Sequence, residues 1–229
     1  MTSLQKRGKS VRTTIPVMAG YLVLGAGFGI LLRTRGYGLG WALAMSAFIY
    51  AGSMQYVAID LLTGGASLLT TAVTTLLVNA RHLFYGISML ERYRAAGRYA
   101  PYLIFSLTDE TYSLVAARED LTGAECFRIS LLDQLYWVLG TALGSLAGAY
   151  LDFNTTGIDF SLTALFLTVF TEQWLETKDH APALIGLGVS IVCRLLFGAD
   201  SFLLPTMGGM LCCLLVLDAR RTKKGGESV

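Results

Sequence analysis

The sequence contains little charge. Of its 229 residues, 15% are charged and 54% are hydrophobic, and the mean hydropathy is +0.56, whereas soluble domains carry about 25% charged residues. Such a chain is too apolar to be disordered and has too few charges for an ordinary soluble domain. Its formal net charge of +2, with basic residues at the ends and in loops, also disfavours nucleic-acid binding. A polytopic membrane protein is the class that remains.

Residues that bind metals or carry out catalysis are also scarce. The chain has 4 cysteines and 2 histidines, and they do not have the spacing of a metal site. The HExxH and GxSxG motifs and a phosphate-binding glycine loop are missing as well. We therefore expect no metal, no cofactor, no disulfide and no enzymatic activity.

Long apolar runs with short polar links fill the chain. A helix needs about 20 apolar residues to span a bilayer, and the runs do not alternate as barrel strands do. The sequence therefore predicts an all-α, polytopic transmembrane helical bundle of about 7–8 membrane segments. We expect a single integral membrane domain over 1–229, with a cytoplasmic basic N-terminus (1–13) and a basic C-terminal tail (219–229). The apolar runs are 14–32, 39–62, 66–90, 101–117, 129–151, 161–175, 182–197 and 201–218.

The first run is expected to remain in the protein as a helix, because it has no convincing signal-peptide cleavage site and ends at Arg33. Two other runs look irregular. Ala51-Gly52-Ser53 lies in the middle of 39–62, and the short run 161–175 contains Thr171-Glu172-Gln173. Glycine and serine are common at helix kinks, and broken helices at matching places in two halves are typical of transporter sites. A weak internal repeat favours two such halves.

The orientation of the chain depends on these irregular runs. Basic termini at both ends favour two cytoplasmic termini. Eight full spans would allow that, but they would place the basic loop around Arg92, Arg94 and Arg98 outside. If 39–62 and 161–175 instead enter the membrane and return, that loop lies inside and six full crossings remain. The two halves would then be inverted.

Seven charged residues fall inside the apolar runs, apart from Asp218 at the end of the last run, although a charge at the bilayer centre costs about 2.5–3.5 kcal/mol on insertion scales. Arg81 is expected to pair with Asp109 or Glu110, and Arg194 with Glu172. These groups serve either as structural ion pairs or as a ligand or proton pathway. Asp60 and Asp133 lie near segment ends and are expected at the membrane interface.

Three polar motifs stand out within the runs. Asn79-Ala80-Arg81-His82 is expected on one helix, with Asn79 and His82 on a shared face and His82 able to carry a proton near neutral pH. Ser106, Asp109 and Ser113 are expected on one face of a second helix. Small residues in the third motif, Tyr50-Ala51-Gly52-Ser53-Met54-Gln55, allow a helix to unwind, or simply to pack closely. Free backbone groups there would suit the carboxylate or ammonium group of an amino acid.

These motifs, in this order, resemble the AzlC family of branched-chain amino-acid permeases. The resemblance rests on three segments, Phe48–Gln55, Asn79–His82 and Thr108–Glu110, and on the glycine-rich helix Gly20–Gly29. It implies export of valine, leucine, isoleucine and sometimes methionine, driven by the membrane potential or a proton gradient. It also implies a small AzlD-type membrane subunit as partner, a multi-pass location in a bacterial inner membrane, and no cofactor.

The predicted site combines the polar motifs with the family resemblance. The predicted substrate-binding residues are Gly52, Ser53, Gln55, Asn79, Arg81 and His82. The predicted proton-coupling or ion-pair residues are Asp109, Glu110, Glu172 and Arg194. Three alternatives stay open: a transporter or channel for a different small organic solute, a non-transporting membrane subunit, and a membrane enzyme, which the absence of catalytic motifs disfavours.

Overall fold

The computed structural model describes residues 3–118, 120–150 and 179–226, together with residues 160, 163, 164, 167, 170, 171, 174 and 175. The chain divides into two compact units, Met1–Thr163 and Ala164–Val229. Every regular element in the described ranges is a helix, which confirms the predicted all-α class. The prediction of one domain over 1–229 stays a prediction.

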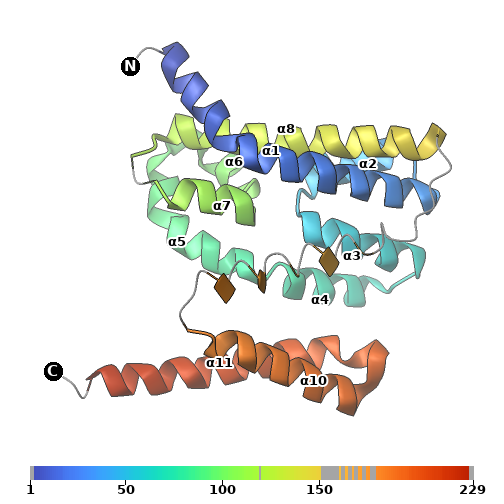
Figure 1. The fold of residues 1–229 in the computed structure, drawn as a ribbon, viewed down its shortest axis with the longest axis vertical. Coiled ribbons are helices and arrows are strands. Elements are labelled where there is room, and N and C mark those ends of the chain that lie inside the picture. The colour runs from blue at the N-terminus through green and yellow to red at the C-terminus, as the bar shows by residue number, and fades with distance from the viewer. Residues whose placement is uncertain are drawn as a thin grey trace. The chain divides into compact units, whose positions relative to one another are not determined.

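Two long helices, α1 (Ser3–Thr34) and α8 (Gly123–Tyr150), form the centre of the first unit. They run parallel, since Leu22 lies against Gly140, Ala26 against Gly144 and Ile30 against Gly148 (Figure 1). A Cβ atom on Gly140 would lie 2.8 Å from the carbonyl oxygens of Tyr21 and Leu22. The glycines therefore allow the two backbones to touch, as small residues do between membrane helices.

The apolar run 39–62 is broken, as predicted. It forms α2 (Leu39–Phe48) and α3 (Gly52–Thr63), which run in opposite directions and make a hairpin (Figure 1). At the tip, Tyr50 has a φ of 43°, a left-handed conformation that is strained for a bulky residue. The chain therefore enters the unit and returns to the end from which it came.

The run 66–90 is also broken, which the sequence did not predict. Its two helices are α4 (Leu68–Val78) and α5 (Arg81–Ala95), and Asn79 and Ala80 lie between them. The prediction of a single helix that carries Asn79 and His82 on one face is wrong. Short polar side chains such as asparagine compete for backbone hydrogen bonds and favour helix ends. Together α4 and α5 run the length of the unit, opposite to α1 (Figure 1).

A second hairpin follows the short helix η1 (Gly97–Tyr99). It consists of α6 (Ala100–Phe105) and α7 (Asp109–Ala116), and it enters from the end opposite to the first hairpin (Figure 1). The prediction that Ser106, Asp109 and Ser113 share a face of one helix is therefore wrong. Thr108 caps α7 by accepting a hydrogen bond from the Thr111 amide, and this cap starts a new helix.

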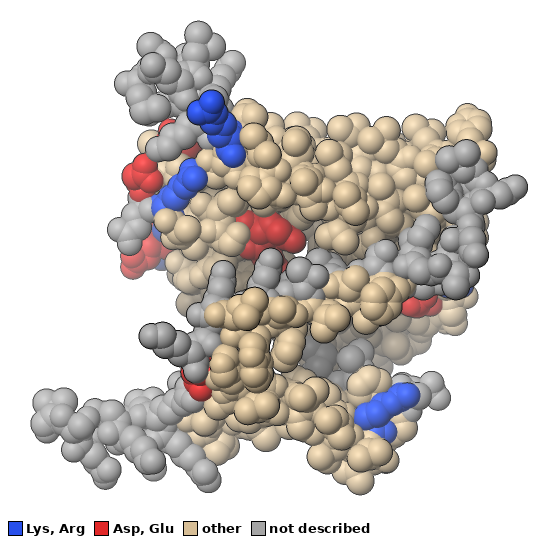
Figure 2. Space-filling model, viewed as in Figure 1, with Lys and Arg blue, Asp and Glu red and all other residues tan. Residues whose placement is uncertain are grey.

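These directions can be compared with both alternatives for the first unit. Eight full spans would require 39–62 and 101–117 to cross, and six crossings would also require 101–117 to cross, whereas both runs form hairpins. The number of full spans stays a prediction. The loop around Arg92, Arg94 and Arg98 lies at the end where α1 begins (Figure 1), as the alternative with a re-entrant 39–62 predicted. On the face in Figure 2, the surface over most of α1 and α8 is uncharged, and charged side chains gather toward that same end.

The second unit contains α10 (Ala181–Ser201) and α11 (Leu203–Gly226). They pack antiparallel, with Gly209 against Val189 and Gly186 near Met210. Most of the irregular run 161–175, including Glu172, lies outside the described residues, and the internal repeat stays a prediction. By length and composition, the helical segments Val11–Thr34 and Ala181–Gly198 can cross a membrane, and Leu39–Phe48, Leu68–Val78 and Gly208–Leu217 are shorter apolar helices.

Candidate functional site

The helix breaks of the two hairpins and of α4–α5 meet near the middle of the first unit. Arg81, at the start of α5, joins them. Its Nη2 donates to Ser53 Oγ of α3 at 2.9 Å, and its Nη1 lies 2.7 Å from Asp109 Oδ2 of α7. Of the two partners that the sequence offered for Arg81, the structure pairs it with Asp109. One guanidinium group thus links both hairpins.

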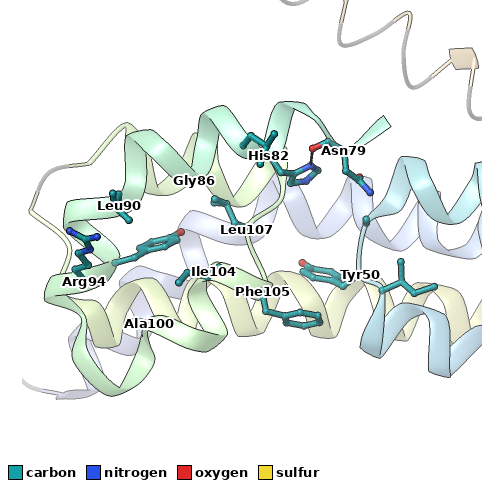
Figure 3. A pocket seen from close by; sticks show the side chains of 14 residues that line it. Tyr50, Asn79, His82, Gly86, Leu90, Arg94, Ala100, Ile104, Phe105 and Leu107 are labelled. Atoms are coloured by element: carbon teal, nitrogen blue, oxygen red, sulfur yellow. Dashed lines mark hydrogen bonds between the residues drawn. The ribbon is translucent and has the colours of Figure 1, made fainter. Parts of the chain in front are cut away.

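A cavity of about 540 Å³ lies beside these breaks. Tyr50, Asn79 and His82 stand at one end and Arg94 at the other (Figure 3), and apolar side chains of α5 and α6 line the length between. The Asn79 carbonyl oxygen lies 3.2 Å from His82 Nδ1, which fixes the imidazole at the cavity wall. The lining residues are Ile49, Tyr50, Ala51, Asn79, His82, Leu83, Gly86, Leu90, Tyr93, Arg94, Ala100, Ile104, Phe105 and Leu107.

Helix ends face this polar end of the cavity. The residues before α3 and α5, Ala51 and Ala80, provide no side-chain cap, although the His82 and Leu83 amides of α5 donate to backbone carbonyls. The positive ends of both helix dipoles nevertheless face this region. By contrast, α7 has Thr108 as a cap and two carboxyl groups in its first turn. The cavity can therefore accept a small anionic group at one end and an apolar group along its length.

The predicted substrate-binding residues divide into two groups. Asn79 and His82 line the cavity, whereas Gly52 packs against the Trp137 ring and Ser53 contacts Arg81. Gln55 is fully buried on the other side of α3, where its Nε2 donates to Ser46 Oγ of α2 at 3.2 Å. The structure thus brings Asn79 and His82 to the cavity but not Gln55.

The predicted proton-coupling residues are also separated. Asp109 and Glu110 stand side by side at the start of α7. Arg194 belongs to α10 in the second unit, where its guanidinium lies over the Phe202 ring at 5.3 Å. Its expected partner, Glu172, is outside the described residues, so that pair stays a prediction.

A buried chain of oxygen atoms was missed by the sequence analysis. Tyr21 OH donates to Glu110 Oε2 at 2.7 Å and lies 2.7 Å from Thr108 Oγ1, which contacts Thr111 Oγ1 at 3.1 Å. Thr111 Oγ1 in turn lies 3.0 Å from Asp133 Oδ2. Asp133 was expected at the interface, but α8 begins well before it at Gly123, and its side chain is fully buried. A prediction that α8 begins at Gly123 would have put Asp133 well inside the helix.

Within the described part of the chain, no three His, Cys, Asp or Glu side chains are grouped to hold a metal ion. The four cysteines there, Cys126, Cys193, Cys212 and Cys213, are not paired.

Comparison with known proteins decides the family. The AzlC protein family matches residues 16–151, which include both hairpins and the three sequence motifs. The chain belongs to the AzlC family. This confirms the resemblance inferred from Phe48–Gln55, Asn79–His82 and Thr108–Glu110.

Curated relatives extend the AzlC match over most of the chain. The branched-chain amino acid transport protein AzlC of Bacillus subtilis is 46% identical over 89% of this chain and 82% of its own length. An uncharacterized membrane protein of Haemophilus influenzae is 41% identical over 92% of this chain and 87% of its own length. The inner membrane protein YgaZ of Escherichia coli is 26% identical over 90% and 87%. Together with the apolar helices, these relatives identify an AzlC-family membrane protein. No solved structure matches the chain.

Proposed function

We propose that this chain is a secondary transporter that exports branched-chain or other small aliphatic amino acids, namely valine, leucine, isoleucine and also methionine. The observation that carries the proposal is the cavity beside the helix breaks. Its polar end suits the charged main-chain groups of an amino acid, and its apolar length suits an aliphatic side chain. The name of the Bacillus subtilis relative, a branched-chain amino acid transport protein, supports the same substrate class.

The roles of the site residues follow from their positions. The substrate carboxylate binds at the uncapped starts of α3 and α5, next to Asn79 and His82. The ammonium group binds the carbonyl oxygens at the ends of α2 and α4. The side chain then lies among residues such as Leu83, Ile104 and Phe105.

The remaining properties extend this proposal. Transport is driven by the proton-motive force, and a small AzlD-type membrane subunit is the partner. The protein is a multi-pass protein of the bacterial inner membrane with both termini cytoplasmic. The cytoplasmic N-terminus is supported by the basic loop between α5 and α6, which lies at the same end of the first unit as the basic start of α1 (Figure 1), and the cytoplasmic C-terminus by its basic tail.

The test is amino-acid efflux from cells loaded with a valine- or leucine-containing dipeptide. Cells express the chain with and without its small neighbouring membrane protein, and we compare the wild type with Asn79→Ala and His82→Ala. Both variants are expected to insert normally and to lose efflux. His180→Ala is the matched control, because His180 belongs to the second unit and stacks on the Trp174 ring.

The outcomes separate the candidate functions. Efflux of valine or leucine that depends on Asn79 supports the proposal and names the substrate. Full efflux in both cavity variants would refute the site. If the inserted wild-type pair releases no aliphatic amino acid, the proposed substrate class is wrong and another small solute has to be tested.

A further inference from the structure

The buried oxygen chain lacks one hydrogen atom if both of its carboxyl groups are ionised. It contains four contacts: Glu110 to Tyr21, Tyr21 to Thr108, Thr108 to Thr111, and Thr111 to Asp133. The three hydroxyl groups bring three hydrogen atoms, and an ionised carboxylate brings none. At O···O distances of 2.7 to 3.1 Å, each contact needs one hydrogen atom between its oxygens. One further proton, on Glu110 or on Asp133, supplies the fourth.

Two directions of hydrogen bonding then satisfy the chain. With the proton on Glu110, each group donates toward Asp133. With the proton on Asp133, each group donates toward Glu110. Going from the first state to the second, every hydroxyl oxygen gains one proton and loses one, and the negative charge moves from Asp133 to Glu110. Thr108 Oγ1 also accepts the Thr111 amide hydrogen bond in both states.

From this count we infer that Glu110 and Asp133 share one proton along the three hydroxyl groups, and that the chain is a proton relay between α7 and α8.

The neighbouring charges favour a shared proton. Arg81 at the start of α5 acts electrostatically on Glu110, but its guanidinium is bound to Asp109 and Ser53. No described residue forms an ion pair with Asp133, whose side chain is fully buried. Asp133 is fully buried and Glu110 is partly buried, and two carboxylates this close to one network, one of them buried without a cation, do not readily both ionise. The other titratable groups that face the relay, Asp109, Tyr50 and Tyr102, bring no positive charge.

Tyr50 connects the relay to the cavity wall. Tyr50 lines the cavity, and its electrostatic neighbours include Asp133, Glu110 and Tyr21 of the relay. Within the described part of the chain, Tyr50 OH and Asp133 Oδ1 are buried without a hydrogen-bond partner. The phenol of Tyr50 in the cavity wall is thus the group that the relay and the cavity have in common. The use of the relay to drive transport rests on the proposed function, whereas the shared proton does not.

The first test detects the proton directly by infrared spectroscopy of the purified protein. The wild type is expected to show a carbonyl band of a protonated carboxyl group that shifts in D2O. Asp133→Asn is expected to lose it, because the asparagine amide donates the fourth hydrogen and leaves Glu110 ionised; Glu110→Gln loses it for the same reason. Asp60→Asn, at an exposed aspartate, keeps the band. No such band in the wild type, or an unchanged band in both variants, overturns the inference.

The second test measures the use of the relay with vesicles from cells that express the chain and its small partner. Valine counterflow without a pH gradient is compared with valine flux driven by a pH gradient. Thr111→Val interrupts the relay and is expected to lose the pH-driven flux, whereas Thr111→Ser restores the hydroxyl and the flux. Tyr21→Phe is expected to behave like Thr111→Val. Tyr136→Phe, which removes a hydroxyl of α8 that is bonded to Thr14 of α1 and lies outside the relay, is expected to behave like the wild type.

These outcomes keep the two proposals apart. If wild-type vesicles show no valine counterflow, the proposed function fails and the infrared band still decides the relay. If counterflow is present and Thr111→Val keeps its full pH-driven flux, the relay has no part in coupling and the inference is overturned.

Discussion

Arg81 Nη1 lies 2.7 Å from Asp109 Oδ2, and this ion pair connects the start of α5 to the start of α7. The same guanidinium group donates to Ser53 Oγ in α3. The hairpins α2–α3 and α6–α7 enter the unit from opposite ends. Arg81 joins α3 of the first hairpin and α7 of the second to the break between α4 and α5. Its loss affects both hairpins at once.

Removal of either partner of this pair is therefore expected to lower both stability and efflux. Arg81→Ala leaves Asp109 without its cation, and Asp109→Ala does the reverse. In the double variant neither charge is left unpaired, so the two substitutions are not expected to be additive. The coupling energy, measured from melting curves of the purified proteins, is expected to be about 1 kcal/mol. It lies toward the low end of the range for contacting pairs because the side chains are 32% and 26% exposed. Strictly additive effects of the two substitutions would contradict this prediction.

A methyl group at Gly29 is expected to separate α1 from α8. A Cβ atom there would overlap the backbone of Thr141 and Ser145, which cannot move aside as a side chain can. Gly29→Ala should lower the free energy of unfolding by about 1–3 kcal/mol or more and reduce the yield of folded protein. Gly20→Ala on the same helix meets no atom within 4 Å and is expected to be neutral. Equal melting temperatures for the two variants would argue against direct contact of the backbones.

Substrate size is expected to depend on Gly86. This residue lines the cavity, and a Cβ atom on it has open space, so Gly86→Ala should fold normally and narrow the cavity. Efflux of leucine, isoleucine and methionine is then expected to fall more than efflux of valine, as measured by amino-acid analysis of the medium. Gly40→Ala in α2, which is equally free of contacts, should leave the order of substrates unchanged. An equal change in the efflux of all four amino acids would contradict the prediction that the substrate side chain lies next to Gly86.

The hairpin arrangement predicts opposite labelling of two positions. In a chain without the native cysteines, Thr63→Cys at the end of α3 and Ala95→Cys at the end of α5 both lie on exposed positions. Because α4–α5 crosses the unit between them, an impermeant maleimide should label Thr63→Cys in intact cells and Ala95→Cys only after permeabilisation. Labelling of both from the same side would exclude a crossing by α4–α5.

The sequence predicted the elements whose signal is local. The uninterrupted apolar runs predicted α1 and α8, and Ala51-Gly52-Ser53 predicted the break between α2 and α3. Thr108-Asp109-Glu110 is a helix-start pattern, so the beginning of α7 was also recognisable, although it was interpreted as the middle of a helix.

The remaining features depend on contacts between distant segments. Nothing local requires a break at Asn79-Ala80; there the first turn of α5 is held by the bonds of Arg81 to Ser53 and Asp109. Likewise, Gln55 looked like a binding residue, but its direction is set by Ser46 on another helix. A single sequence shows the polar residues but does not show which of them contact one another in the fold.

The four-residue steps between α1 and α8 have a consequence for alternating access. Leu22, Ala26 and Ile30 each lie against a glycine of α8, so the two helices interlock at every fourth residue. To slide, they would have to move by a whole helical turn of about 5.4 Å, because smaller shifts drive carbonyl groups into backbone. In the proposed transporter we therefore expect this pair to stay fixed and the hairpins, whose connections contain the positive-φ residues Gly36, Gly65 and Gly97, to move.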